Sequence, residues 1–370
     1  MKYKRMPIEM ESPEELGYEK LRCNLAESSI TDTSLSELGI HIDDLVLAYG
    51  DHKGNPQLRE LIASAYHGIH ADDVLLTPGA AGALFIVATA LLEKKDHLVV
   101  AFPNYATNLV TPEAIGCSIS KVEMKFENDF QLPFSAVKKK IRPSTKLISI
   151  TNPHNPAGTT LTENELQQLV TLAESKKCFL LVDETYRDLN RGENSSLAAT
   201  LSADAISVSS ISKAYGLPGI RIGWIITKNK KLKELFLAAK EQMFICNSVI
   251  DEEIALRFLQ SPEKRNEKIR KHIAANFSIL EKFMQKNLFL EWVKPSGGVV
   301  CFPRFRKDLK IDEKEFYRIL NEKYGTYVGP GHWFGMSDRY MRIGFGWPSA
   351  KELDAGLKNI ALAAKQAMRK

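Results

Sequence analysis

Between residues 73 and 227, short runs of apolar and β-branched residues alternate with longer amphipathic segments. This alternation is typical of a mostly parallel sheet, because parallel strands need long crossover connections that are usually helices. The predicted strands are Val74–Thr77, His97–Phe102, Ser118–Glu123, Lys146–Thr151, Phe179–Asp183, Ala205–Ser209 and Ile222–Thr227. The predicted helices between them are Ala80–Glu93, Tyr105–Ile115, Pro133–Lys140 and Glu163–Ser175.

The length of 370 residues is more than one hydrophobic core usually accommodates, so we expect two domains. The large domain is predicted to span residues 41–285, and a smaller α+β domain to combine residues 1–40 with 286–370. A charged stretch without glycine, from Thr227 to about Asn287, is expected to be helical and to lead out of the large domain. The small domain is expected to contain Glu291–Lys294, Val299–Phe305, Glu313–Lys323, Tyr340–Phe345 and Ala350–Met368 as its strands and helices.

Composition argues against several classes of protein. The net charge of +5 is scattered, and the lysine run 138–140 is not interleaved with aromatic residues, so we expect no nucleic-acid partner. Five widely spaced cysteines form no CxxC pair, which predicts a reducing compartment and no metal site. The longest apolar stretch, Ala80–Leu92, is too short to cross a bilayer, and the charged N-terminus does not look like a signal peptide. We therefore expect a cytoplasmic protein without a membrane partner.

Unusual polar segments follow four of the predicted strands. They are TPGAA at 77–81, NPHNPAG at 152–158, DETY at 183–186 and SSISKAYGLPGIRIGW at 209–224. Ligands of open α/β sheets bind outside the carboxyl ends of the strands, so these four segments are predicted to form one site.

The last segment resembles the SxSK…GxRxG signature of the class I/II aminotransferases, which are pyridoxal-phosphate (PLP) enzymes of fold type I. The other three match motifs of that family in the expected order, and the resemblance covers nearly the whole chain. It implies a large domain with a seven-stranded, mostly parallel sheet and a smaller α+β domain. It also implies a PLP cofactor and transfer of an amino group from an L-amino acid to a 2-oxo acid.

Two residues are the candidates for the central chemistry. Lys213 follows a strand closely and lies near Ser210 and Arg221, so it is predicted to form the Schiff base with PLP and to move a proton. Taken alone, it would be read as a solvated surface lysine. Asp183 ends a buried apolar run, where an unpaired charge is costly, so it is predicted to face the pyridine nitrogen. The plainer interpretation of Asp183 is a helix N-cap.

The resemblance supplies the remaining cofactor contacts. Asn155 and Tyr186 are expected to bind the phenolic oxygen of PLP, with Tyr186 counted among the catalytic residues, and Tyr105 is expected to stack on the ring. A helix start offers amide N–H groups and a positive dipole end to the phosphate, aided by a hydroxyl and a guanidinium. The residues of this expected phosphate site are Gly79, Ala80, Ala81, Ser210 and Arg221.

Two further residues are implied at the edges of the site. Tyr49 begins a segment, 49–59, that resembles the family's YxxxxGxxxLR motif, whose tyrosine reaches the phosphate in the neighbouring subunit. This implies a homodimer with shared active sites. Arg342, between apolar residues near the C-terminus, matches the arginine that clamps the substrate carboxylate, alongside Asn155. Alone, Arg342 would be the polar face of a strand.

The segment 24–29 reads NLAESS, where many relatives carry a Gly-Glu-Pro type stretch. This loop commonly lines the side-chain pocket, so Glu27 is predicted to face the substrate and to favour a basic or polar amino acid. In the competing interpretation, Glu27 lies on the surface or pairs with Arg22.

Other functions remain open at this point. A PLP lyase, oxidase or cyclase can use the same scaffold, and the stretch from His52 to Gly219 also looks like enzymes of peptide-antibiotic precursor synthesis. A transcription regulator would add a helix-turn-helix module, and the short stretch in front of Tyr49 argues against one.

Overall fold

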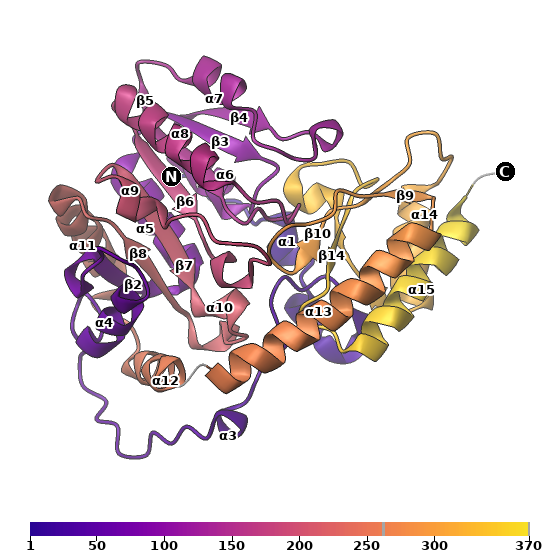
Figure 1. Cartoon of the computed structure of the whole chain (residues 1–370), viewed down its shortest axis with the longest axis horizontal. Coiled ribbons are helices and arrows are strands. Elements are labelled where there is room, and N and C mark those ends of the chain that lie inside the picture. The colour runs from indigo at the N-terminus through magenta and orange to yellow at the C-terminus, as the bar shows by residue number, and fades with distance from the viewer. Residues whose placement is uncertain (261–262, 369–370) are drawn as a thin grey trace.

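The computed structural model describes residues 1–260 and 263–368. A seven-stranded sheet in the order β2-β8-β7-β6-β5-β3-β4 forms one side of the molecule (Figure 1). Strand β8 is antiparallel to both of its neighbours, and the other adjacent pairs are parallel. The predicted strands are confirmed to within one residue at each end: β2 (Val74–Pro78), β3 (His97–Phe102), β4 (Ser118–Glu123), β5 (Thr145–Thr151), β6 (Phe179–Asp183), β7 (Ala205–Ser210) and β8 (Ile222–Ile226).

Helices cover both faces of this sheet, which is why its central strands read as continuous apolar runs. On one face, α5 (Gly79–Leu91) and α11 (Lys230–Phe244) pack against Val100 and Ile206 of the strands. On the other face, α7 (Phe134–Lys140) and α8 (Glu163–Ser175) pack against the neighbouring strand residues Val99 and Ile148. Helix α6 (Thr107–Ile115) connects β3 to β4.

The charged stretch after β8 is helical, but it is divided. Instead of one long helix it forms α11, α12 (Val249–Leu259) and α13 (Glu263–Lys286). After α11, Ile245 takes a left-handed φ of 57°, which a β-branched residue rarely adopts and which stops the helix. The Ser248 hydroxyl then caps α12 by accepting a hydrogen bond from the Asp251 amide at 3.3 Å.

The second lobe contains short strands and the helices α14 (Glu313–Arg318) and α15 (Ala350–Ala367). Strand β14 (Met341–Gly344) lies between β10 (Val300–Cys301) and β13 (Gly329–Pro330), while β9 (Leu290–Glu291) pairs with β11 (Arg304–Phe305). The expected strand over 299–305 is therefore two shorter ones. Strand β1 (Cys23–Asn24) pairs with β12 (Thr326–Tyr327), so the N-terminal segment joins this lobe.

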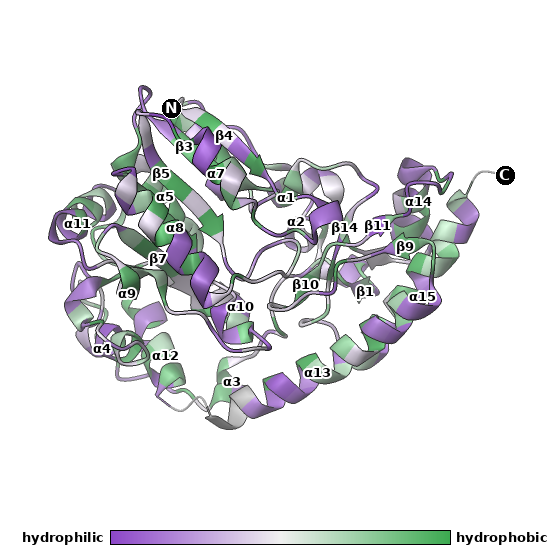
Figure 2. Cartoon of the chain, turned by 45° about the horizontal axis from the view of Figure 1, so that its top comes forward, coloured by the Kyte–Doolittle hydropathy of each residue, from purple (hydrophilic) through white to green (hydrophobic). Residues whose placement is uncertain are grey.

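Helix α13 lies along α15 (Figure 1), and hydrophilic and hydrophobic bands alternate along both helices (Figure 2). Ile273, Leu280 and Met284 of α13 share a core with Phe305 and Phe316 of the second lobe. The predicted boundary at 285/286 falls at the end of α13 and remains a prediction. Within the described residues, no helix is both long and apolar enough to cross a membrane.

Candidate active site

A cavity of about 470 Å³ lies at the carboxyl ends of the sheet strands, where residues of the second lobe and the N-terminal segment close over it. Its wall brings together most of the residues predicted from sequence: Glu27, Ala80, Ala81, Tyr105, Asn155, Asp183, Tyr186, Ser210, Lys213, Arg221 and Arg342. Gly79 and Tyr49 are not on this wall.

Lys213 stands on a short helix, α10 (Ile211–Ala214), that begins directly after β7. The Ser210 hydroxyl caps this helix and accepts a hydrogen bond from the Ser212 amide at 3.4 Å. The carbonyl oxygen of Lys213 accepts from the Ile30 amide at 3.1 Å, which ties the turn to the N-terminal segment. The backbone that carries the Lys213 amine is therefore held by the helix cap in front of it and by the N-terminal segment.

Asp183 ends β6 with 4% of its surface exposed. Its Oδ1 accepts hydrogen bonds from the hydroxyl of Thr185 at 2.6 Å and from the amide of Thr185 at 3.1 Å. Burial nevertheless raises the pKa of this carboxyl, and no cationic side chain of the described residues forms an ion pair with it. A buried carboxylate on a cavity wall is stable when a ligand brings a positive charge, and the protonated ring nitrogen of PLP has that chemistry.

The N-terminus of α5 has the features of an anion site. Gly79 takes a φ of +69°, and a Cβ there would collide with the Arg221 guanidinium. Gly79 does not line the cavity, but its missing side chain lets Arg221 approach the start of the helix. The guanidinium is oriented by the Pro218 carbonyl at 2.7 Å and by the Ser212 hydroxyl at 3.4 Å. Free helix amides beside a guanidinium suit a phosphate group.

Arg342 projects from β14 and is 4% exposed. Its Nη2 donates to the Ala26 carbonyl at 2.7 Å and its Nη1 to Asn155 Oδ1 at 3.2 Å, while its buried Nε has no partner. Burial lowers the pKa of this guanidinium. The structure therefore places Arg342 and Asn155 together, with an unused N–H group available for an anionic ligand.

The aromatic candidates also lie on the cavity wall. Tyr186 is buried, and the Tyr105 hydroxyl donates to Glu9 Oε1 at 3.2 Å. Burial, reinforced by Glu9, raises the pKa of Tyr105. Glu27 accepts a hydrogen bond from Tyr18 at 3.1 Å, and it forms no ion pair with Arg22 within the part of the chain that the structure describes. Glu27 is half-buried on the cavity wall, and its contact with a substrate remains a prediction.

The N-terminal segment contributes cavity residues that the sequence analysis did not identify. Ile8, Glu9, Ser12, Pro13, Glu14 and Tyr18 all line the cavity, as does Trp333 of the second lobe. These residues belong to no recognised motif. Their sequence signal is limited to acidic residues interspersed with apolar ones in the first 20 positions.

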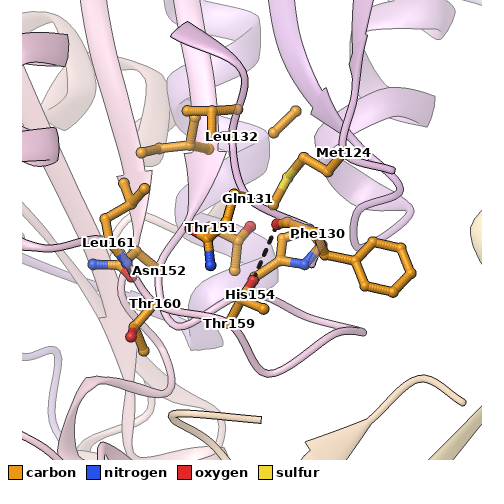
Figure 3. A pocket seen from close by; sticks show the side chains of 12 residues that line it. Met124, Phe130, Gln131, Leu132, Thr151, Asn152, His154, Thr159, Thr160 and Leu161 are labelled. Carbon is orange, nitrogen blue, oxygen red and sulfur yellow. Dashed lines mark hydrogen bonds between the residues drawn. The ribbon is translucent and has the colours of Figure 1, made fainter. Parts of the chain in front are cut away.

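Another, much smaller cavity of about 10 Å³ is lined by Asn152 and His154 among other residues (Figure 3). The Thr159 hydroxyl donates to the Phe130 carbonyl at 3.3 Å beside it, shown as the dashed line in Figure 3. His154 Nε2 donates to the Pro103 carbonyl at 2.8 Å, and burial lowers the pKa of this imidazole to about 4, so it is neutral. A space of this size holds one water molecule at most.

Comparison with known proteins agrees with this geometry. The family model "Aminotransferase class I and II" matches residues 26–360. Capreomycidine synthase of Streptomyces vinaceus is 28% identical over 333 residues, covering 86% of this chain and 82% of the relative. The crystal structure of a PLP-dependent aminotransferase from Streptococcus suis superposes with a TM-score of 0.91 at 26% identity, over 100% of both chains. That of the PLP-dependent cyclase OrfR gives a TM-score of 0.88 at 25% identity, over 99% of this chain and 98% of the cyclase.

The family match covers most of the chain, the fold is that of the PLP fold type I enzymes, and the buried carboxylate and anion site fit the two charged ends of the cofactor. The chain therefore belongs to the class I and II aminotransferases, which are enzymes that use pyridoxal 5′-phosphate.

Proposed function

We propose that Lys213 binds the cofactor covalently and that the chain transfers the amino group of an L-amino acid to a 2-oxo acid in this cavity. The observation that carries the proposal is that one cavity wall holds the amine of Lys213, the buried carboxyl of Asp183 and the guanidinium of Arg342. Bound PLP supplies an electron sink that makes the α-proton of the amino acid acidic.

Each remaining group has a place in this proposal. Asp183 would hold the proton on the ring nitrogen, and Tyr105 would lie against the ring. Asn155 and Tyr186 would bind the phenolic oxygen. The phosphate would be held by the amides of Ala80 and Ala81 with Ser210 and Arg221, for which the start of α5 supplies the positive dipole end.

The substrate is held by residues of the second lobe. Arg342 would pair its unused N–H group with the α-carboxylate, next to Asn155. This would place the α-carbon beside Lys213, whose amine would take the proton from that carbon and deliver it to the cofactor, as net transfer of the amino group requires. Orientation of this kind lowers the entropic part of the activation barrier.

Replacement of Lys213 tests the proposal. The purified protein should absorb visible light through its bound cofactor, and Lys213→Ala should lose the covalent link and the turnover. Borohydride reduction followed by peptide mapping should place the label on Lys213. Lys230→Ala, at the start of α11 and away from the cavity, is the matched control and should behave as the wild type. A label on any other lysine would refute the assignment.

A cyclase is the second candidate function. It is favoured by the similarity to the cyclase OrfR and to capreomycidine synthase, because the same scaffold supports both outcomes. Mass spectrometry of the products distinguishes the two. Amino-group transfer yields the oxo acid of the donor and the amino acid of the acceptor in equal amounts, whereas a cyclase leaves the acceptor unchanged and releases a ring product.

We also propose a homodimer in the cytoplasm. Tyr49 is 85% exposed and lies away from the cavity of its own chain, next to the exposed Val46 and Leu47. An exposed apolar stretch of this kind suits a subunit interface, from which Tyr49 would reach the phosphate of a second copy. The five cysteines are all unpaired, which supports a reducing compartment.

A further inference from the structure

The N-terminal side of the cavity is strongly acidic. Glu9, Glu14 and Glu27 all line it. In the described residues none of the three forms an ion pair, although Glu9 and Glu27 act on Arg342 from a distance and oppose the effect of burial on its pKa. The three glutamates therefore put more negative charge on this side of the cavity than its own side chains neutralise.

The inference drawn below rests on the proposed function, in which each cation on the same wall already has a partner. Lys213 and Arg221 serve the cofactor, and Arg342 serves the α-carboxylate of the substrate. Asp183 has the ring nitrogen as its counterpart. When cofactor and substrate backbone are bound, the three glutamates remain as the charges for which the cavity offers no partner.

Two of the three carboxylates, Glu9 and Glu27, accept hydrogen bonds from tyrosine hydroxyls. Tyr18 donates to Glu27 Oε1 at 3.1 Å and stacks on Trp347 at a centroid distance of 6.2 Å. Glu27 and Glu14 both raise the pKa of Tyr18, so both lie near its hydroxyl. Tyr105 donates to Glu9 at 3.2 Å. A carboxylate that a tyrosine holds in place needs little reorganisation when a cation arrives.

An independent observation also indicates a ligand at this end of the cavity. Ser12 lines the cavity, is 6% exposed, and its hydroxyl has no hydrogen-bond partner. Buried hydroxyls are normally paired, because an unpaired one loses its hydration without compensation. A donor group on a ligand would satisfy this oxygen.

We infer that the side-chain end of the substrate pocket takes a cation, so that the amino donor is an L-amino acid ending in a guanidinium or an ammonium group. A guanidinium offers five N–H donors in a plane and pairs well with carboxylates, whereas an ammonium offers three. Without substrate, water can solvate these carboxylates, since Glu9 and Glu27 are half-buried and Glu14 is exposed. A bound side chain would exclude that water and strengthen the attraction.

The test compares substrates that differ in charge alone. L-Arginine and L-citrulline have nearly the same shape, but citrulline ends in a neutral urea. With wild-type holoenzyme, KM for arginine should be about 10- to 100-fold lower, the size of a charge-assisted hydrogen bond. L-Lysine against L-norleucine makes the same test for an ammonium group, and comparing the two ratios shows which cation the pocket prefers. Titration of the cofactor spectrum with each amino acid, in the absence of an oxo acid, measures binding and the first half-reaction without complete turnover.

Two glutamate variants complete the experiment. Glu27→Gln and Glu14→Gln should raise KM for arginine by roughly 10- to 100-fold and change KM for citrulline far less. Glu15→Gln is the matched control, because Glu15 lies in the same segment, pairs with Arg5 at 3.6 Å and is not on the cavity wall. The control should retain the wild-type preference.

Three outcomes would count against the inference, and they can be told apart. Equal KM values for arginine and citrulline would overturn the cationic pocket, as would a preference for aromatic or aliphatic donors; the proposed function would stand in both cases. If no amino acid of any class changed the cofactor spectrum or formed an oxo acid, the proposed function itself would fail, and the inference with it.

Discussion

The carboxyl group of Asp183 is buried at the end of β6, where Thr185 supplies two hydrogen bonds to one of its oxygens. An asparagine at this position could keep those bonds through its carbonyl oxygen, but it could not hold a proton on the ring nitrogen. We therefore expect Asp183→Asn to retain the cofactor while kcat falls by about 10²- to 10³-fold, the range seen when one electrostatic contact in an active site is lost.

Absorbance of the bound cofactor and steady-state kinetics measure the two parts of this prediction separately. Asp188→Asn is the matched control, since Asp188 is an exposed neighbour that accepts a hydrogen bond from Tyr215 at 2.8 Å. Near-normal turnover in Asp183→Asn would contradict the role given to this carboxyl.

At the scale of elements, the N-terminal segment with α1 (Pro7–Met10) and α2 (Pro13–Leu16) is fastened to the second lobe next to the cavity. Glu11 Oε2 accepts hydrogen bonds from His332 Nε2 and from the Trp333 indole, both at 2.8 Å. His332 Nδ1 donates to Asp338 at 2.8 Å. Asp338 and Glu11 together raise the pKa of His332 to about 9, so this imidazole is a cation between two carboxylates at neutral pH.

Because the pKa of His332 is raised in the folded protein, its contact with Glu11 and Asp338 is lost at high pH. A histidine whose pKa is higher in the folded protein contributes stability in full below its unfolded pKa, near 6.5, and loses the contribution as pH rises through about 9. We expect KM for the amino donor to rise several-fold between pH 8 and 10, because the segment that closes the cavity is then held less firmly. Limited proteolysis within the first 20 residues should accelerate over the same range.

Glu11→Gln should weaken the link to His332 at every pH and flatten this dependence, while Glu15→Gln should leave it unchanged. A pH dependence of KM and of proteolysis that is the same in Glu11→Gln as in the wild type would show that His332 does not fasten the segment.

Elements with a strong local signal could be predicted from the sequence. Each strand of the large sheet is a short apolar run between turn residues. Thr162 and Glu165 have the spacing of a capping pair at the start of α8, and both capping hydrogen bonds are present there. The division between α11 and α12 was missed, because the charged stretch contains no glycine; the Asn247-Ser248 pair in front of α12 was the available signal.

At the scale of the whole molecule, one wall of the cavity could be predicted from the sequence and the other could not. Residues from motifs in the large sheet lie close together because the carboxyl ends of its strands meet at one edge. The acidic side does not follow from any motif, since Glu9 and Glu14 come from single-turn helices whose position depends on contacts with His332, Trp333 and Tyr327. Contacts between residues so far apart in the chain leave no periodic pattern in the sequence.

The proposed homodimer is also a property of the whole molecule, and its shared sites make a specific prediction. If Tyr49 completes the phosphate site of a second copy, Tyr49→Phe should weaken cofactor binding by about 10- to 100-fold, the size of a hydrogen bond to a charged group. Sedimentation should still show a dimer, because the exposed Val46 and Leu47 are unchanged.

Mixing two variants then tests whether the sites are shared. Dimers of Lys213→Ala have no functional lysine, and dimers of Tyr49→Phe have two weakened phosphate sites. A mixed dimer contains one site in which Lys213 of one subunit meets Tyr49 of the other, so native cofactor affinity should return in up to one site per mixed dimer. The measurement is cofactor titration of the mixture after subunit exchange, compared with the sum of the separate variants. If the mixture equals that sum although mixed dimers have formed, Tyr49 acts within its own chain or outside the site altogether, and the shared-site arrangement is wrong.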